Sequence, residues 1–405
     1  MKQFRTLSFA FWAFLPSFVF GVITAAVAQV KTEDSLLASL PETASFAAGQ
    51  YTLMLGALKD DPKMPRTFTA GKLETVKPQD WTSGFFPGSL WYLSELTGDS
   101  TWTRPAADYT ARLEELGSFT GHHDVGFMLY CSYGNGYRLS HKPAYRKILL
   151  QGAESLATRF DPKVGMIRSW SHGEWKYPVI IDNMMNLELL TWAAREGGGK
   201  HLQNIAVSHA DLTLKNHFRE DASSFHVVDY DPETGAVSGK MTFQGFADDS
   251  SWARGQAWAL YGYTMMARET GKETYLNHAL RIADFIMKHP RLPADKVPYW
   301  DFDAPDIPNA KRDASAAAII ASAMIELACK AKGERGKEML DFARLQLLTL
   351  SSPAYLAKPG ENGNFILMHS VGFLPRDSEV DVPINYADYY FLEALLRYRK
   401  AMAGK

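Results

Sequence analysis

The sequence has only two cysteines among its 405 residues, which is too few for a disulfide-stabilised scaffold. Cys131 and Cys329 both lie in apolar segments with a helical pattern, so we expect two buried free thiols. The chain also lacks a run of basic residues and carries a formal net charge of −2. This near-neutral balance argues against nucleic acid or an anionic membrane surface as a partner.

Several sequence motifs are missing as well. There is no nucleophilic serine elbow, no glycine-rich phosphate loop and no nucleotide-binding fingerprint, so the sequence indicates no cofactor. No proline- or serine-rich linker and no low-complexity stretch interrupts residues 34–402. The sequence therefore predicts one domain, which we place at residues 29–405.

The N-terminus has the layout of a secretory signal peptide. A basic start is followed by an apolar run and then by the small residues Ala26–Ala28, which is typical of a cleavage site. An uncleaved membrane anchor is less consistent with this segment because Pro16 interrupts the apolar run. We therefore expect residues 1–28 to be a signal peptide, with no membrane insertion after cleavage. The expected location is the periplasm, with secretion as the alternative.

Two kinds of helical pattern alternate along the rest of the chain. One kind is amphipathic with a charged face, as in residues 141–160, and the other is apolar nearly all round, as in residues 314–330. A helix that is apolar on every face is buried, and an amphipathic helix covers it. About twelve such helices alternate, which predicts an all-α fold of two concentric rings, an (α/α)6 barrel. An irregular helical bundle is the alternative.

Two segments look like strands. Residues 225–245 have the pattern of a hairpin that turns at Pro232–Gly235, and residues 165–180 are rich in aromatic residues. We expect these short strands to lie at the rim of one end of the barrel.

A short polar and aromatic segment precedes each apolar helix. The six segments are "QDWTSG", "GHHDVG", "VIIDNM", "SSWARG", "KRDAS" and "INYAD". If the inner helices run parallel, these segments meet at one end of the barrel. The free N–H groups and partial positive charge of helix N-termini would favour an anionic ligand there.

Two aspartates in these segments are candidates for chemistry. Asp182 follows an apolar run, so it is either a helix cap or a carboxylic acid whose pKa is raised by apolar neighbours. Asp124 has the same placement, and we interpret it as a cap or as an acceptor for sugar hydroxyls. His122, His123 and Asp124 are adjacent in sequence, a spacing that rarely converges on one ion, so we predict no metal site.

Aromatic residues make up 13% of the chain and include ten tryptophans, which suits a sugar-binding cleft as well as a core. Arg254, at the start of an apolar helix, requires an anion. The spacing allows a structural pair with Asp248 or Asp249, and a ligand carboxylate is the alternative. His226 lies in the expected hairpin, and a single histidine in an aromatic setting does not by itself indicate a functional site.

The chain resembles the unsaturated glucuronyl hydrolases, glycoside hydrolase family 88. The segments that carry the resemblance are "DWTSGFFPGSLWYLSELTGD", "HHDVGFMLYCSYGNGYRL", "IIDNMMNLELL", "SSWARGQAW" and "INYADYYFLEALLR". The resemblance implies an (α/α)6 barrel that acts on lyase-generated oligosaccharides ending in a 4,5-unsaturated uronic acid. It also implies that Asp182 is the general acid and base and that Asp124 is the second essential aspartate. The other matching cleft positions are Trp81, His123, His226, Gln244, Arg254 and Trp258. Ser370 falls in the region where sulfate-tolerant members carry a serine- and lysine-bearing segment.

The implied reaction is hydration of a vinyl ether. Asp182 would protonate C4, the same carboxylate would activate the water that adds to C5, and the resulting hemiketal would open. Arg254 would then face the uronate. Two other functions are alternative interpretations: an unsaturated galacturonyl hydrolase that acts on pectin or rhamnogalacturonan fragments, and a non-catalytic glycan-binding barrel. A polysaccharide lyase on the same barrel is a third.

Overall fold

The computed structural model describes Met1, residues 34–331 and residues 333–404. Apart from Met1, the expected signal peptide at residues 1–28 lies outside the described residues. Residues Ser35–Lys405 form one compact unit.

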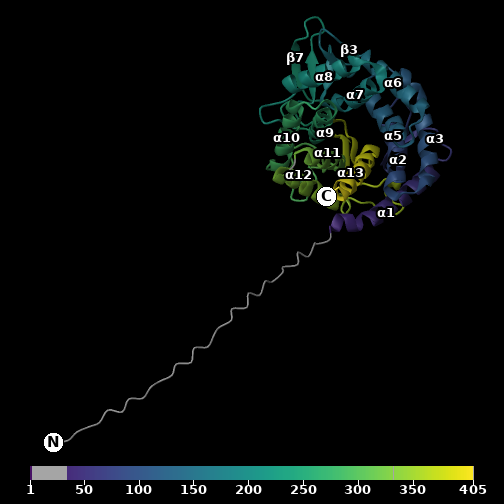
Figure 1. Cartoon of the computed structure of the whole chain (residues 1–405), viewed down its shortest axis with the longest axis vertical. Helices are drawn as coiled ribbons and strands as arrows, with labels where there is room; N and C mark the ends of the chain where they lie inside the picture. Colours follow the sequence, from purple (N-terminus) through teal and green to yellow (C-terminus); the bar gives the residue numbers. More distant parts are fainter. Residues whose placement is uncertain (2–33, 332, 405) are drawn as a thin grey trace. The chain divides into compact units, whose positions relative to one another are not determined.

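This unit is a double ring of helices (Figure 1). The inner ring contains α2 (Phe85–Thr97), α4 (Val125–Leu129) continued by η3 (Tyr130–Gly134) and α5 (Asn135–Ser140), η4 (Ile181–Asn186) continued by α7 (Leu187–Ala193) and η5 (Ala194–Gly198), α9 (Ala253–Thr270), α11 (Ala314–Ala331) and α13 (Asn385–Ala403). The outer ring contains α1 (Ser35–Ala57), α3 (Thr103–Ala111), α6 (Pro143–Ala157), α8 (Lys200–Asn216), α10 (Glu273–Lys288) and α12 (Gly333–Leu350). The predicted (α/α)6 barrel is confirmed.

Helix composition explains the two rings. The outer helix α10 buries one stripe that includes Tyr275, Ala279, Ile282 and Ile286, a spacing of three to four residues. The inner helix α11 is instead buried on nearly every face. Among the described residues it is the one helix long and apolar enough to cross a membrane, but 78% of that span is buried within this unit. It is therefore a core helix of the barrel.

Short antiparallel strands accompany the helices. They are β1 (Met64–Thr69) with β2 (Lys72–Val76), β3 (Phe160–Asp161) with β4 (Met166–Ile167), β5 (Pro178–Ile180) with β6 (Val227–Tyr230) and β7 (Val237–Met241), and β8 (Ser370–Phe373) with β9 (Ser378–Val382). The hairpin predicted within residues 225–245 is confirmed as β6 and β7, and residues 165–180 supply β4 and β5. The strand β3 and the pairs β1–β2 and β8–β9 were not predicted.

The two cysteines differ in environment. Both are free thiols, and Cys131 is buried in η3. Cys329 is exposed in the last turn of α11, so the expectation of two buried thiols is wrong for this residue. Here α11 reaches the end of the inner ring and its last turn is partly uncovered, although the segment is apolar.

Candidate active site

The polar segments that precede the inner helices converge at one end of the barrel, as predicted. The Asn385 side chain, at the start of α13, donates to the Thr82 carbonyl before α2 at 3.0 Å. The Phe127 N–H in α4 donates to Asn186 Oδ1 in η4 at 3.0 Å. Arg254 at the start of α9 contacts Asp313, which precedes α11. These contacts link neighbouring helix N-termini around the ring.

Asp182 lies in the first turn of η4, directly after β5, and is only 8% exposed. Burial raises its pKa to about 7; the charge of Arg254 opposes this shift and the charge of Asp124 adds to it. Its side chain does not cap the helix, and Oδ2 has no hydrogen-bond partner among the described residues. Asp182 is thus a buried carboxyl group that exchanges a proton near neutral pH and has a free oxygen.

His226 faces this oxygen from the hairpin. Its Nε2 atom lies 3.8 Å from Asp182 Oδ2. The backbone N–H groups of Phe243 and Gln244 both donate to its Nδ1, at 3.0 and 3.1 Å. Burial lowers the pKa of His226 to about 3, so the ring is neutral. Because Nδ1 accepts two hydrogen bonds, the proton is on Nε2, where it points toward the carboxyl group.

Asp124 precedes α4 between two histidines. Its Oδ2 lies 3.1 Å from His122 Nδ1 and its Oδ1 lies 3.3 Å from His123 Nε2. Burial opposes its ionisation, but the neighbouring His123 together with hydrogen bonds from His122 and Asn186 holds its pKa below the usual range. Its side chain makes no capping hydrogen bond to α4. At neutral pH Asp124 is therefore ionised, whereas Asp182 is protonated in part of the molecules. The two carboxyl groups thus differ in average charge.

Arg254 is 1% exposed and finds its anion within the protein. Its Nη1 lies 3.4 Å from Asp313 Oδ2, and Asp313 is fully buried. The guanidinium also donates to the Val371 carbonyl and, at 2.6 Å, to the Gly372 carbonyl in β8. Neither Asp248 nor Asp249, which the spacing allowed as structural partners, supplies this anion; it comes from Asp313, directly before the next inner helix α11.

Arg254 nevertheless keeps a free donor. Its Nε has no hydrogen-bond partner among the described residues. The guanidinium lies 4.5 Å from the ring of Trp252 and 5.3 Å from that of Tyr386. The side chain thus anchors β8 and presents one N–H beside aromatic rings.

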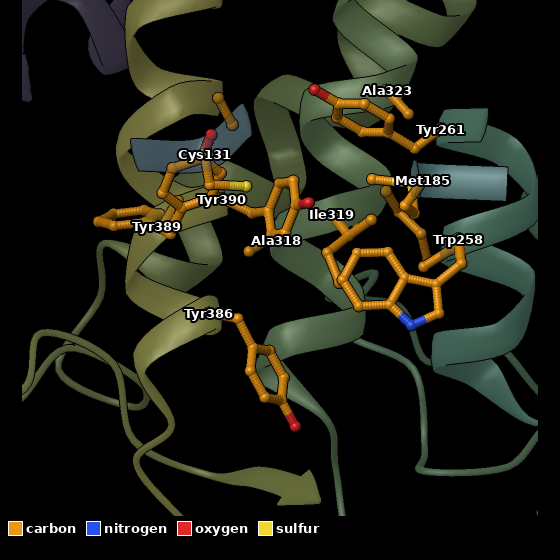
Figure 2. Packing of buried hydrophobic residues seen from close by; sticks show 14 of the residues in the cluster. Cys131, Met185, Trp258, Tyr261, Ala318, Ile319, Ala323, Tyr386, Tyr389 and Tyr390 are labelled. Atoms are coloured by element: carbon orange, nitrogen blue, oxygen red, sulfur yellow. The ribbon is translucent and has the colours of Figure 1, made fainter. Parts of the chain in front are cut away.

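The predicted tryptophans lie in an aromatic layer across the barrel. Trp81 is partly exposed, and its ring centroid is 5.1 Å from Tyr386 and 5.6 Å from Phe127. Trp258 is fully buried, 5.0 Å from Phe127, and its Nε1 has no partner in the described part of the chain. Figure 2 shows Tyr386 and Trp258 displaced along the inner helices from Tyr390 and Met185. These rings lie just before or within the first two turns of α2, α4, α9 and α13, at the same end of the barrel as Asp182 and Asp124, and we call this layer the aromatic floor.

The remaining predicted residues meet β8. Gln244 is half-buried, and its Nε2 donates to the Gly372 carbonyl at 3.1 Å. Ser370 is the first residue of β8; it is fully buried, and no described residue pairs with its hydroxyl. Gln244 and Arg254 therefore share one acceptor, the carbonyl of Gly372.

Sequence reasoning missed three residues of this site: Asp313, Tyr386 and Asn186. Asp313 and Tyr386 lie in "KRDAS" and "INYAD", the same position before an inner helix that drew attention to Asp124 and Asp182. Their position directly before or at the start of an apolar helix was enough to identify both as candidate site residues. Asn186 lies inside η4, where no sequence pattern separates it from a helix-surface amide.

A double ring of helices with a proton-exchanging carboxyl group and an aromatic floor at one end defines an (α/α)6-barrel glycoside hydrolase. No family model matches the chain. An unsaturated glucuronyl hydrolase of Formosa agariphila is 50% identical over 325 residues, which cover 80% of each chain. An unsaturated chondroitin disaccharide hydrolase of Streptococcus pyogenes serotype M1 is 31% identical over 89% of this chain and 91% of the relative.

Solved structures agree with these relatives. The crystal structure of an unsaturated glucuronyl hydrolase specific for heparin has a TM-score of 0.87 and 49% identity, covering 90% of this chain and 98% of the other. The chain belongs to the unsaturated glucuronyl hydrolases, glycoside hydrolase family 88.

Proposed function

We propose that the protein hydrolyses lyase-generated unsaturated oligosaccharides of glycosaminoglycans and releases the 4,5-unsaturated uronic acid from the non-reducing end. The observation that carries this proposal is the buried carboxyl group of Asp182, with its pKa near 7 and an unpartnered oxygen. A vinyl ether is protonated on carbon, so the acid must hold its proton at neutral pH and still serve as a base one step later.

In the proposed reaction, Asp182 gives its proton to C4 of the C4=C5 bond. The positive charge that forms at C5 is shared with the ring oxygen. A water molecule then loses a proton to the Asp182 carboxylate and adds to C5. The resulting hemiketal ring opens to a C5 ketone, and the hemiacetal left at C1 breaks down to an aldehyde and releases the next sugar with its hydroxyl group. One carboxyl group performs both transfers, so the separation rule for paired-carboxylate glycosidases does not apply.

The surrounding residues support this chemistry. The Nε2–H of His226, which has no partner among the described residues, is placed to orient Asp182 or the attacking water. The ionised Asp124 accepts hydrogen bonds from ring hydroxyls. The free Nε–H of Arg254 and the ring of Trp81 supply a donor and an apolar face for the uronate ring. Gln244, Trp258 and Ser370 complete the proposed binding set.

We further propose that the protein is exported, with the periplasm as its location. The support is the signal-peptide pattern of residues 1–28 together with a substrate class that originates outside the cytoplasm. N-terminal sequencing of the protein recovered from a periplasmic extract tests this, and we expect cleavage after Ala28. An intact N-terminus in the cytoplasmic fraction contradicts it.

The reaction is tested with an unsaturated chondroitin disaccharide. The conjugated C4=C5 bond absorbs ultraviolet light, so hydration appears as loss of absorbance. We expect Asp182→Asn to reduce kcat by at least about 10³-fold, because the amide cannot transfer the proton, while substrate binding stays measurable. Reaction in deuterated water should place deuterium at C4.

Asp249→Asn, which alters an exposed aspartate near the barrel end, is the matched control and should keep full activity. Activity that survives in Asp182→Asn contradicts the assignment of the acid. A gain of absorbance from intact polymer identifies a lyase instead, and faster loss with rhamnogalacturonan fragments identifies the galacturonyl reaction.

A further inference from the structure

A second cavity lies further along the same inner helices, beyond the aromatic layer that forms the floor of the active site. It has a volume of about 570 Å³. Tyr390 lies one helical turn past Tyr386, and Tyr261 lies about one turn past Trp258. Figure 2 shows the same displacement along the barrel. We name this space the far cavity; its lining includes Tyr130, Trp192, Tyr261, Tyr390, Arg268 and Arg397.

One wall of the far cavity is aromatic. The ring of Trp192 lies 6.1 Å from that of Tyr130 and 5.5 Å from that of Tyr137. Tyr390 is 2% exposed and Trp192 is 6% exposed, yet both line the cavity. The Tyr390 hydroxyl and the Trp192 indole N–H have no hydrogen-bond partner in the part of the chain that the structure describes. Both donors belong to side chains that line the cavity, so a molecule bound there can accept hydrogen bonds from them.

The lining also carries charged side chains, and these are already paired with opposite charges. Arg268 pairs with Glu269 at 2.9 Å and with Glu326 at 2.8 Å, and Arg397 pairs with Glu326 at 2.9 Å. Arg397 also contacts Glu393, at 3.3 Å. Two exposed cations of the lining, Arg138 and Lys400, are paired in the same way, both with Glu95. The far cavity thus presents polar groups, and its charged side chains are already paired with opposite charges.

We propose that the far cavity binds an uncharged mono- or disaccharide. Aromatic faces pack against the C–H faces of a sugar, and paired ionic side chains bond to hydroxyls without demanding a charge. The unpartnered donors of Tyr390 and Trp192 supply hydrogen bonds to sugar oxygens. The volume falls in the range of about 300–1,000 Å³ that small-molecule sites occupy. The far cavity is separate from the active site, and sugar binding there does not depend on the proposed role of Asp182.

The test uses N-acetyl-D-glucosamine as the uncharged probe and D-glucuronate as its charged counterpart. Crystals of the full mature chain soaked in the uncharged probe should show it beside Tyr390 and Trp192. In titrations followed by saturation-transfer NMR, Tyr390→Phe should weaken binding of this probe about fivefold, because the variant keeps the ring and loses one hydrogen bond.

Tyr133→Phe is the matched control, since Tyr133 is also a buried tyrosine of the inner ring but does not line the cavity. It should change the affinity less than twofold, and circular dichroism verifies that both variants are folded. The proposal is overturned if Tyr390→Phe binds the uncharged probe as the unaltered protein does. It is also overturned if the soaked crystals hold no sugar in the far cavity or if D-glucuronate occupies it more tightly.

Discussion

Two buried aspartates show how the surroundings of a carboxyl group decide its role. Burial raises the pKa of both Asp182 and Asp388 to about 7. The Asp388 carboxylate, however, accepts hydrogen bonds from the N–H groups of Ile366 and Leu367 and from the Tyr51 hydroxyl, so its oxygens are engaged. Asp182 Oδ2 has no such partner among the described residues. Availability of an oxygen, rather than the pKa alone, therefore distinguishes the reactive carboxyl group from the structural one.

The raised pKa of Asp182 predicts a pH-dependent cost in stability. The ordinary pKa is 3.8, and the folded value is about 7. Well below the ordinary pKa both states are protonated, but between the two pKa values the unfolded chain is ionised while the folded protein still holds its proton, so wild-type stability falls over this window and levels off above about pH 7. Asp182→Asn does not titrate, so its unfolding free energy should rise relative to wild type between pH 4 and pH 8 by up to about 4 kcal/mol.

Urea unfolding at several pH values measures this difference. Asp388 is present in both proteins, so its own titration cancels in the comparison. A difference between wild type and Asp182→Asn that stays constant from pH 4 to pH 8 would mean that Asp182 ionises as easily in the folded protein as in the unfolded chain.

At the scale of elements, the hairpin β8–β9 is held against the barrel by side chains from several other segments. Arg254 in α9 donates to two β8 carbonyls, and Gln244 donates to one of them. Arg66 in β1 pairs with Glu379 in β9. The sequence did not predict this hairpin, because both strands are short and their register is irregular. Contacts with distant segments stabilise it, and no local turn signal reveals them.

The buried pair of Arg254 and Asp313 predicts a large coupling energy. Arg254→Met leaves the fully buried Asp313 without its cation and removes the guanidinium donors to the Val371 and Gly372 carbonyls, so we expect a loss of about 3–5 kcal/mol in unfolding free energy. Asp313→Asn in the same chain removes the uncompensated charge and should recover part of that loss. A double-mutant cycle by urea unfolding measures the coupling.

The same cycle separates stability from binding at Arg254. If the double variant is folded but still has a raised KM for the unsaturated disaccharide, the free Nε–H of Arg254 contributes to substrate binding. Equal losses in Arg254→Met and in the double variant would show that Asp313 is not the anion on which Arg254 depends.

At the scale of the whole barrel, the periodicity of the chain predicted the architecture, and the family resemblance implied the same fold. Apolar and amphipathic helices alternate, and a double ring buries the first kind beneath the second. The same alternation placed Asp124, Asp182 and Arg254 at one end. It could not identify the partner of Arg254, because Asp313 is 59 residues away in sequence and meets it only after two neighbouring hairpins pack. The far cavity was also beyond prediction, since its lining depends on how six helices face one another.

Closure of the ring depends on Asn385, which joins the last inner helix to the first hairpin. The side chain is fully buried, and its Nδ2 donates to the carbonyls of Pro65, at 2.8 Å, and Thr82, at 3.0 Å. Asn385→Ala leaves both carbonyls without this donor, so we expect a loss of about 2–4 kcal/mol in unfolding free energy. Because Thr82 adjoins Trp81 and residue 385 adjoins Tyr386, the aromatic floor should also loosen and kcat/KM should fall.

Asn277→Ala, at an exposed position on the outer helix α10, is the control and should change neither quantity. A stability of Asn385→Ala within about 0.5 kcal/mol of this control would show that the ring closes through the packing of α13 against α2 alone.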